Sequence, residues 1–189
     1  MCGFVMGSIL SVFVLFDYLF LLREISMNAI DVLRSTYMTS RMVLKSYAGD
    51  FTDSELMNRA HPECNHLAWQ LGHLISAECM FVDQLSAGNA FVLPDGFADQ
   101  YGRETQGDND ASHFLGTADY MDLLDKVQDA TFAALDKTSE SELDEDAPAM
   151  YQPMFPTKGA VWVLVATHNM MHAGQFVAVR RACGKGVVI

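Results

Sequence analysis

The chain has 189 residues and a formal net charge of −12, with half of its residues hydrophobic and no run rich in lysine or arginine. A chain of this length can bury a core without disulfide or metal staples, and so acidic a surface repels phosphate backbones, which predicts no nucleic-acid partner. Four cysteines, at positions 2, 64, 79 and 183, are scattered without a CxxC pair. This usage suits a reducing compartment and predicts a cytoplasmic protein.

The first 26 residues form an apolar extension whose role the sequence leaves open. Residues 4–22, FVMGSILSVFVLFDYLFLL, carry one charge, Asp17, and are just long enough to span a bilayer. No Lys or Arg precedes them and no small-residue cleavage site follows, so they lack the features of a signal peptide. Three interpretations stand: an over-long start with Met27 as the true initiator, a membrane anchor, or an extra packed helix. Membrane contact and a membrane-anchored location are expected only in the second case.

Residues 27–189 show helical periodicity and no sustained two-residue alternation. Large apolar residues recur at helical spacing in segments that predict four long helices, over 28–48, 64–86, 118–138 and 158–182. The second segment is apolar nearly all round and is therefore expected at the centre. Long connections follow the second and third helices. This pattern predicts an all-α fold, an antiparallel or crossover four-helix bundle over 27–189 with the apolar segment added in front.

Turn and capping residues mark several boundaries. Thr52 and Glu55 form a capping box that predicts a short helical turn. Thr117 is expected to cap the third long helix and Thr157 to open the fourth. Gly184 is expected to end that last helix.

Histidines at helical spacing are the strongest chemical signal in the chain. His168 and His172 stand four residues apart in the last predicted helix, so their side chains leave the same face. His73 lies two turns into the central helix, beside Gly72, where a neighbouring helix can approach closely. His66 precedes His73 by seven residues, a rise of about 10.5 Å. Both cannot reach one ion, and the deeper His73 is the better candidate ligand.

Three neutral imidazoles, two from an HxxxH step and one from a facing helix, match divalent zinc, nickel or iron. Three protein ligands leave one coordination position open, which is the catalytic rather than the structural pattern. The spacing alone leaves a second interpretation, in which the histidines are hydrogen-bonded core residues.

Two stretches of the chain resemble the DinB-like superfamily, also known as the YfiT-like metal-dependent hydrolases. NHLAWQLGHLISAE contains the tryptophan-bearing helix with G-H-L, and THNMMHAGQFVAVRRACGKG contains the H-x-x-x-H-A-G-Q step, the R-R pair and the G-K close, in family order. The resemblance covers residues 27–189 and departs at Gly186, where many relatives have proline. It implies a four-helix bundle with a metal-binding triad of His73, His168 and His172.

The resemblance also implies a bound divalent metal, with zinc or nickel favoured, a small-molecule substrate and a homodimer. In characterised branches the activity is transfer of a low-molecular-weight thiol to an electrophile, or thiol-dependent isomerisation. The open position would bind the thiol as thiolate, or water as hydroxide for hydrolysis, and either nucleophile would use the same ligands. The alternative is a non-catalytic metal-binding bundle that acts in dimerisation or stress-linked binding.

Other polar residues are expected in supporting roles. Glu78 lies about 140° around the helix from His73, which favours a contact with another helix over metal ligation. Gln175, three residues after His172, is expected in packing or surface hydrogen bonding rather than as a partner of a ligand. Trp69, Met170 and Met171 are expected in the core. Arg180 and Arg181 are expected at a solvated helix end rather than in contact with a substrate carboxylate. His61 and His113 are expected in loops and are given no role.

Overall fold

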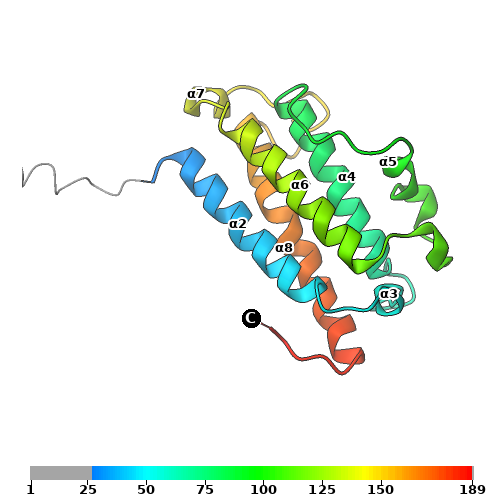
Figure 1. Ribbon diagram of the computed structural model, residues 1–189. Coiled ribbons are helices and arrows are strands. Elements are labelled where there is room, and N and C mark those ends of the chain that lie inside the picture. Colours follow the sequence, from blue (N-terminus) through cyan, green and yellow to red (C-terminus); the bar gives the residue numbers. More distant parts are fainter. Residues whose placement is uncertain (1–26, 189) are drawn as a thin grey trace, which may run out of the picture.

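The computed structural model describes residues 27–188 as an all-α fold (Figure 1). The apolar segment 4–22 and its three interpretations lie outside these residues. The long helices are α2 (Ala29–Ala48), α4 (Leu67–Leu85), α6 (Thr117–Leu135) and α8 (Lys158–Ala182), and the short ones are α3 (Asp53–Leu56), α5 (Phe97–Gln100) and α7 (Glu140–Leu143). Two 3₁₀ turns, η1 (Arg103–Thr105) and η2 (Ala111–His113), lie between α5 and α6. The predicted four-helix bundle is confirmed.

The described residues form no β-strand, and their only strand-like pairing is an isolated bridge between Asp146 and Thr157. Within the same residues, no helix combines the length and the apolar character that crossing a membrane requires.

The helices have a crossover arrangement. The Ser40 hydroxyl of α2 donates to the Ala166 carbonyl of α8, and further along both helices Arg180 donates to the Tyr47 carbonyl. Residue numbers therefore increase in the same direction along α2 and α8. In Figure 1, α4 and α6 both run in the direction opposite to α2 and α8, and the long connection that carries α5 joins them. That connection returns the chain to the end of the bundle at which α4 begins, and its Tyr101 ring packs there against Gly72.

Local sequence explains most helix ends. Thr52 and Glu55 make the predicted capping box at α3, and the Thr157 hydroxyl accepts from the Ala160 amide at the start of α8. Gly184 follows α8 with φ of 72°, the left-handed conformation that ends a helix. These three boundary predictions are confirmed.

The start of α6 differs from its prediction, because Thr117 is the first helical residue rather than the cap. The cap position is Gly116, which has no side chain to offer. The Asp53 carboxylate of α3 instead accepts from the Thr117 amide at 2.8 Å, and the Thr117 hydroxyl donates to the Phe51 carbonyl at 2.7 Å. A carboxylate here satisfies an unpaired N–H and complements the helix dipole.

The central position of α4 places a charged residue inside the bundle. Glu78 is 4% exposed and accepts hydrogen bonds from Tyr37 and Arg41 of α2 and from Thr131 of α6. The Glu78 carboxylate therefore links α4 to α2 and α6. The predicted contact of Glu78 with another helix is confirmed, and its carboxylate is not part of a metal site. Apolar residues of α4 surround this network, including Leu71, Leu74 and Ile75, which are at most 1% exposed.

Candidate metal centre

Three histidines from two helices meet on one side of the bundle. His73 projects from α4, and His168 and His172 project from α8; each offers a ring nitrogen, and the three nitrogens lie within 4.8 Å of one another. The ring centroid of His73 is 5.5 Å from that of each partner, and the centroids of the α8 pair are 5.0 Å apart. In the described part of the chain, no other His, Cys, Asp or Glu side chains gather in this way. The arrangement can hold a metal ion.

The spacing of the three nitrogens is close to that of a site with a metal ion bound. Three nitrogens that each lie about 2.1 Å from a common ion are within about 4 Å of one another. The structure places all three ring nitrogens within 4.8 Å of one another, which is close to that spacing. Three neutral nitrogen donors suit a divalent transition metal.

Burial keeps all three imidazoles in the neutral form that binds metal. Desolvation, together with the neighbouring His73, lowers the pKa of His168 to about 4. Desolvation and the two other imidazoles lower the pKa of His172 to about 3. The pKa of His73 is also lowered by burial, although a hydrogen bond with the backbone of Tyr101 opposes the shift. The triad therefore needs no deprotonation to bind a cation at neutral pH.

Gln70 orients His172. Its Oε1 lies 2.9 Å from the Nδ1 of His172, and its Nε2 donates to the Asn65 carbonyl at 2.8 Å. An amide oxygen only accepts, so this contact places the imidazole proton on Nδ1 and leaves Nε2 free for a metal. The sequence analysis missed Gln70, although it stands three residues before His73 on the same face of α4. Gln175, the glutamine considered there, is exposed.

Comparison with known proteins assigns the chain to a family. The sequence profile of the DinB superfamily matches residues 36–176, a range that contains all three histidines. The chain belongs to the DinB superfamily. No curated protein matches the chain.

His66 lies outside the triad of this DinB bundle, as the rise along the helix predicts. It is the N-cap of α4: its Nδ1 accepts from the Trp69 amide at 3.0 Å, and its Nε2 lies 3.1 Å from the Asp108 carbonyl oxygen. Both nitrogens of this fully buried ring are therefore engaged with backbone groups. Of the remaining histidines, His61 lies in the connection before α4 and His113 ends the exposed turn η2.

Gly72 admits an aromatic ring rather than the neighbouring helix that the sequence suggested. A Cβ at this position would lie 2.1 Å from a ring atom of Tyr101, which belongs to the connection between α4 and α6. Only glycine permits this contact. The Tyr101 hydroxyl lies 2.8 Å from that of Tyr120 on α6, so the connection is held against both helices.

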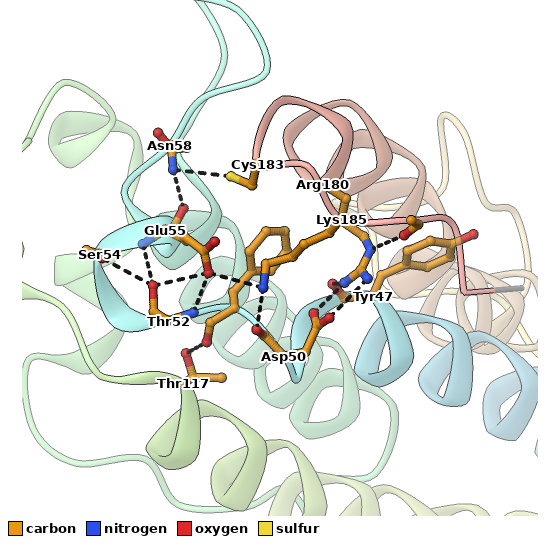
Figure 2. A network of polar contacts seen from close by, with 12 residues as sticks. Tyr47, Asp50, Thr52, Ser54, Glu55, Asn58, Thr117, Arg180, Cys183 and Lys185 are labelled. Atoms are coloured by element: carbon orange, nitrogen blue, oxygen red, sulfur yellow. Dashed lines mark hydrogen bonds and ion pairs between the residues drawn. The ribbon is translucent and has the colours of Figure 1, made fainter.

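Arg180 corrects the prediction of a solvated helix end (Figure 2). Its side chain is buried and donates to the carbonyls of Tyr47 and Gly186 and to both carboxylate oxygens of Asp50. These contacts arise because α2 and α8 end side by side, which the sequence of α8 alone does not reveal. These contacts within the chain occupy the guanidinium, which therefore does not bind a substrate carboxylate. Arg181 is exposed, as predicted.

The core assignments on α4 and α8 have mixed outcomes. Trp69 is 4% exposed, as expected of a core residue. Met170 and Met171 are 40% and 58% exposed, so their predicted place in the core is wrong. The two methionines face outward because His168 and His172 take the inward positions on that part of α8.

The metal affinity of the triad is expected to change by less than about tenfold between about pH 7.5 and about pH 5.5. Three histidines with ordinary pKa values near 6.5 would be mostly protonated at the lower pH and would lose about a thousandfold in affinity. Here the lowered pKa values of His168 and His172 keep both rings neutral until the pH approaches 4. Zinc titrations against a competing chelator at several pH values measure this, and a thousandfold loss would contradict it.

Proposed function

We propose that the chain is a metal-dependent enzyme in which His73, His168 and His172 hold a divalent ion, zinc or nickel in preference to iron. The observation that carries the proposal is the convergence of three imidazoles from α4 and α8, of which His172 is buried and the other two are partly buried, all with lowered pKa values. Within residues 27–188, no fourth His, Cys, Asp or Glu joins the group. Three protein ligands leave room for an exchangeable one, which is the arrangement of catalytic sites.

The chain's own residues would prepare the ligand set. Gln70 holds the proton of His172 on Nδ1, so the ring presents Nε2 to the ion. The Phe81 ring lies 5.9 Å from that of His168 and makes this side of the site apolar. When bound, the ion would lower the pKa of a thiol or a water at its open position.

The reaction we infer is thiol S-transfer or hydrolysis on a small molecule. In the transfer, the thiol loses its proton to solvent, its sulfur forms a bond to an electrophilic carbon, and the leaving group departs with the electron pair of the broken bond. In the hydrolysis, the oxygen of water takes the place of the sulfur. Both reactions need the same three ligands and an accessible fourth position, and a low-molecular-weight thiol is the proposed co-substrate of the first.

A screen of small thiols against a chlorinated dinitrobenzene tests the transfer, and ester substrates without thiol test the hydrolysis. Metal analysis of the purified protein accompanies both assays. Turnover by the zinc- or nickel-loaded protein, absent from the metal-free protein and from His168→Ala, supports the enzyme. A protein that binds metal with the expected affinity but gives no turnover in either assay overturns catalysis and favours the non-catalytic alternative.

The alternative function, dimerisation, is favoured by an uncharged face on α2 and α8. The two helices flank a groove of about 320 Å³ lined by Ser35, Thr36, Thr39, Ser40, Thr167 and Met170. Val32 and Val163, one turn before Thr36 and Thr167, are about half exposed. The exposed face of α6, in contrast, carries several aspartates. Because two copies with a charge of −12 repel each other, this uncharged face is the place where a second copy can approach.

We expect a homodimer that associates through this groove. The apolar helix α4 does not supply this surface, because it is buried inside the bundle. Thr39→Glu, which adds a negative charge in the groove, is expected to convert the dimer to monomer, while Ala133→Glu on the exposed face of α6 is not. Light scattering at tens of micromolar protein measures the mass, and a monomeric wild-type chain would contradict the expectation.

A further inference from the structure

We propose that Trp69 is a positioning residue that fixes the imidazole plane of His73 for the metal, and that Thr105 holds Trp69 in place. The inference rests on the proposed function, because His73 is one of the three proposed ligands. It adds that the orientation of the His73 ring depends on the connection between α4 and α6.

Trp69 and His73 are stacked face to face on α4. Their ring centroids are 4.9 Å apart and their planes differ by 10°. Residues four apart share a helix face, but a parallel stack is one particular orientation among those open to the pair. An imidazole nitrogen binds a metal in the plane of its ring, so the orientation of that plane decides where the lone pair points. The buried indole blocks rotation of the imidazole on one side.

Thr105 fixes the indole from outside α4. The Trp69 Nε1–H donates to the Thr105 Oγ1 at 3.0 Å. The same hydroxyl lies 2.6 Å from the Gln100 carbonyl oxygen and 2.9 Å from that of Gly102, so its own proton is directed away from the indole. Thr105 therefore acts as a pure acceptor towards Trp69, and the indole is held by the connection as well as by its own helix.

The same connection reaches His73 a second time. The backbone of Tyr101 lies beside the His73 imidazole, and the Tyr101 ring packs on Gly72. His73 thus has the Trp69 face on one side and the Tyr101 backbone nearby. Both contacts depend on the segment 100–105, which links the order of this segment to the geometry of the metal site.

Metal affinity measured on three variants tests the proposal. Trp69→Leu removes the stack, Trp69→Phe keeps a ring but removes the N–H donor, and Thr105→Val removes the acceptor at nearly constant volume. Loss of groups that orient a ligand typically weakens metal binding by about 10- to 100-fold. We expect a loss in this range for Trp69→Leu and a smaller one for the other two variants. We expect none for the matched control Trp162→Phe, which alters the chain's other tryptophan, a buried residue that packs with Val161 and Val165 of α8 in another part of the core.

Two spectroscopic readouts separate positioning from general destabilisation. Bound cobalt reports the ligand geometry through its visible absorption, which is expected to change in Thr105→Val and to stay unchanged in Trp162→Phe. In Trp162→Phe the emission comes from Trp69 alone, and nickel or cobalt is expected to quench most of it because the indole lies against a ligand. In Trp69→Phe the remaining Trp162 emission is expected to respond weakly.

The outcomes distinguish the two proposals. If direct metal analysis shows that the wild-type chain binds no metal, the proposed function and this inference are both wrong. If metal binds, but folded Thr105→Val and Trp69→Leu match the wild type in affinity and in cobalt spectrum, the positioning role is overturned while the metal site stands. Circular dichroism and thermal midpoints verify folding, and the mild Thr105→Val variant keeps the test decisive if Trp69→Leu does not fold.

Discussion

Replacing His73 with alanine is expected to weaken zinc or nickel binding by at least about a hundredfold, whereas replacing His66 should change it only a few-fold. Removing a ligand exceeds the 10- to 100-fold effect of removing a group that merely supports one. His73 contributes a nitrogen to the triad. The nitrogens of His66 are engaged with the Trp69 amide and the Asp108 carbonyl instead. His66→Ala should lower the free energy of unfolding by at least about 1 kcal/mol, because it removes a helix cap together with a fully buried ring.

The two variants form a matched pair, because each removes one imidazole from the N-terminal half of the same helical segment. Chelator competition gives the affinities, and metal analysis after gel filtration gives the stoichiometry. Equal losses in both variants would contradict the assignment of His73, since they would indicate a stability effect shared by the two positions. Retention of one tightly bound ion by His73→Ala would exclude it as a ligand.

The four long helices were predictable because their signals are local. Apolar spacing and capping residues act within one or two turns, so predicted ranges such as 158–182 agree closely with Lys158–Ala182. The start of α4 was placed at 64, three residues early, for a specific reason. Its cap is His66, and an imidazole that accepts from the Trp69 amide is outside the usual set of Ser, Thr, Asp and Asn caps.

Contacts between distant segments account for the errors. Asp53 caps α6 from 64 positions away, and Asp50 removes Arg180 from solvent because α2 and α8 end together. Neither partner has a local signature. The approach of Tyr101 to Gly72 is of the same kind, since the glycine indicates a close contact but not what makes it.

The candidate site was more accessible to sequence reasoning than these contacts. The spacing of His168 and His172 follows directly from helix geometry, and the rise per residue chose His73 over His66. The role of Gln70 has no signal in the spacing of α8 residues, because Gln70 contacts His172 from α4. The orientation of each ring depends on such cross-helix partners, which periodicity does not define.

Replacing Glu78 with glutamine is expected to lower the free energy of unfolding by about 3 kcal/mol, a large part of the stability of a domain this size. The side chains of Glu78 and Arg41 are 5% and 2% exposed. Burial disfavours the Arg41 charge, but the charges and hydrogen bonds of Glu78 and Tyr37 together outweigh this effect, so the pKa of Arg41 is raised. The Arg41 Nη1 has no hydrogen-bond partner within the described residues, which leaves this cation strongly dependent on Glu78.

A double-mutant cycle identifies the cause of that loss. Glu78→Gln leaves the buried Arg41 guanidinium without a counter-charge. Arg41→Met likewise leaves the buried Glu78 carboxylate without a counter-charge. Each single variant is therefore destabilised. The double variant removes both charges and should be more stable than the sum of the single effects predicts. Asp125→Asn, which breaks the exposed pair with Lys45, is the control and should change the unfolding free energy by less than about 1 kcal/mol. Urea unfolding measures all four variants. Additive losses in the double variant would show that the two buried charges do not depend on each other, and that Glu78 stabilises the bundle through Tyr37 and Thr131 instead.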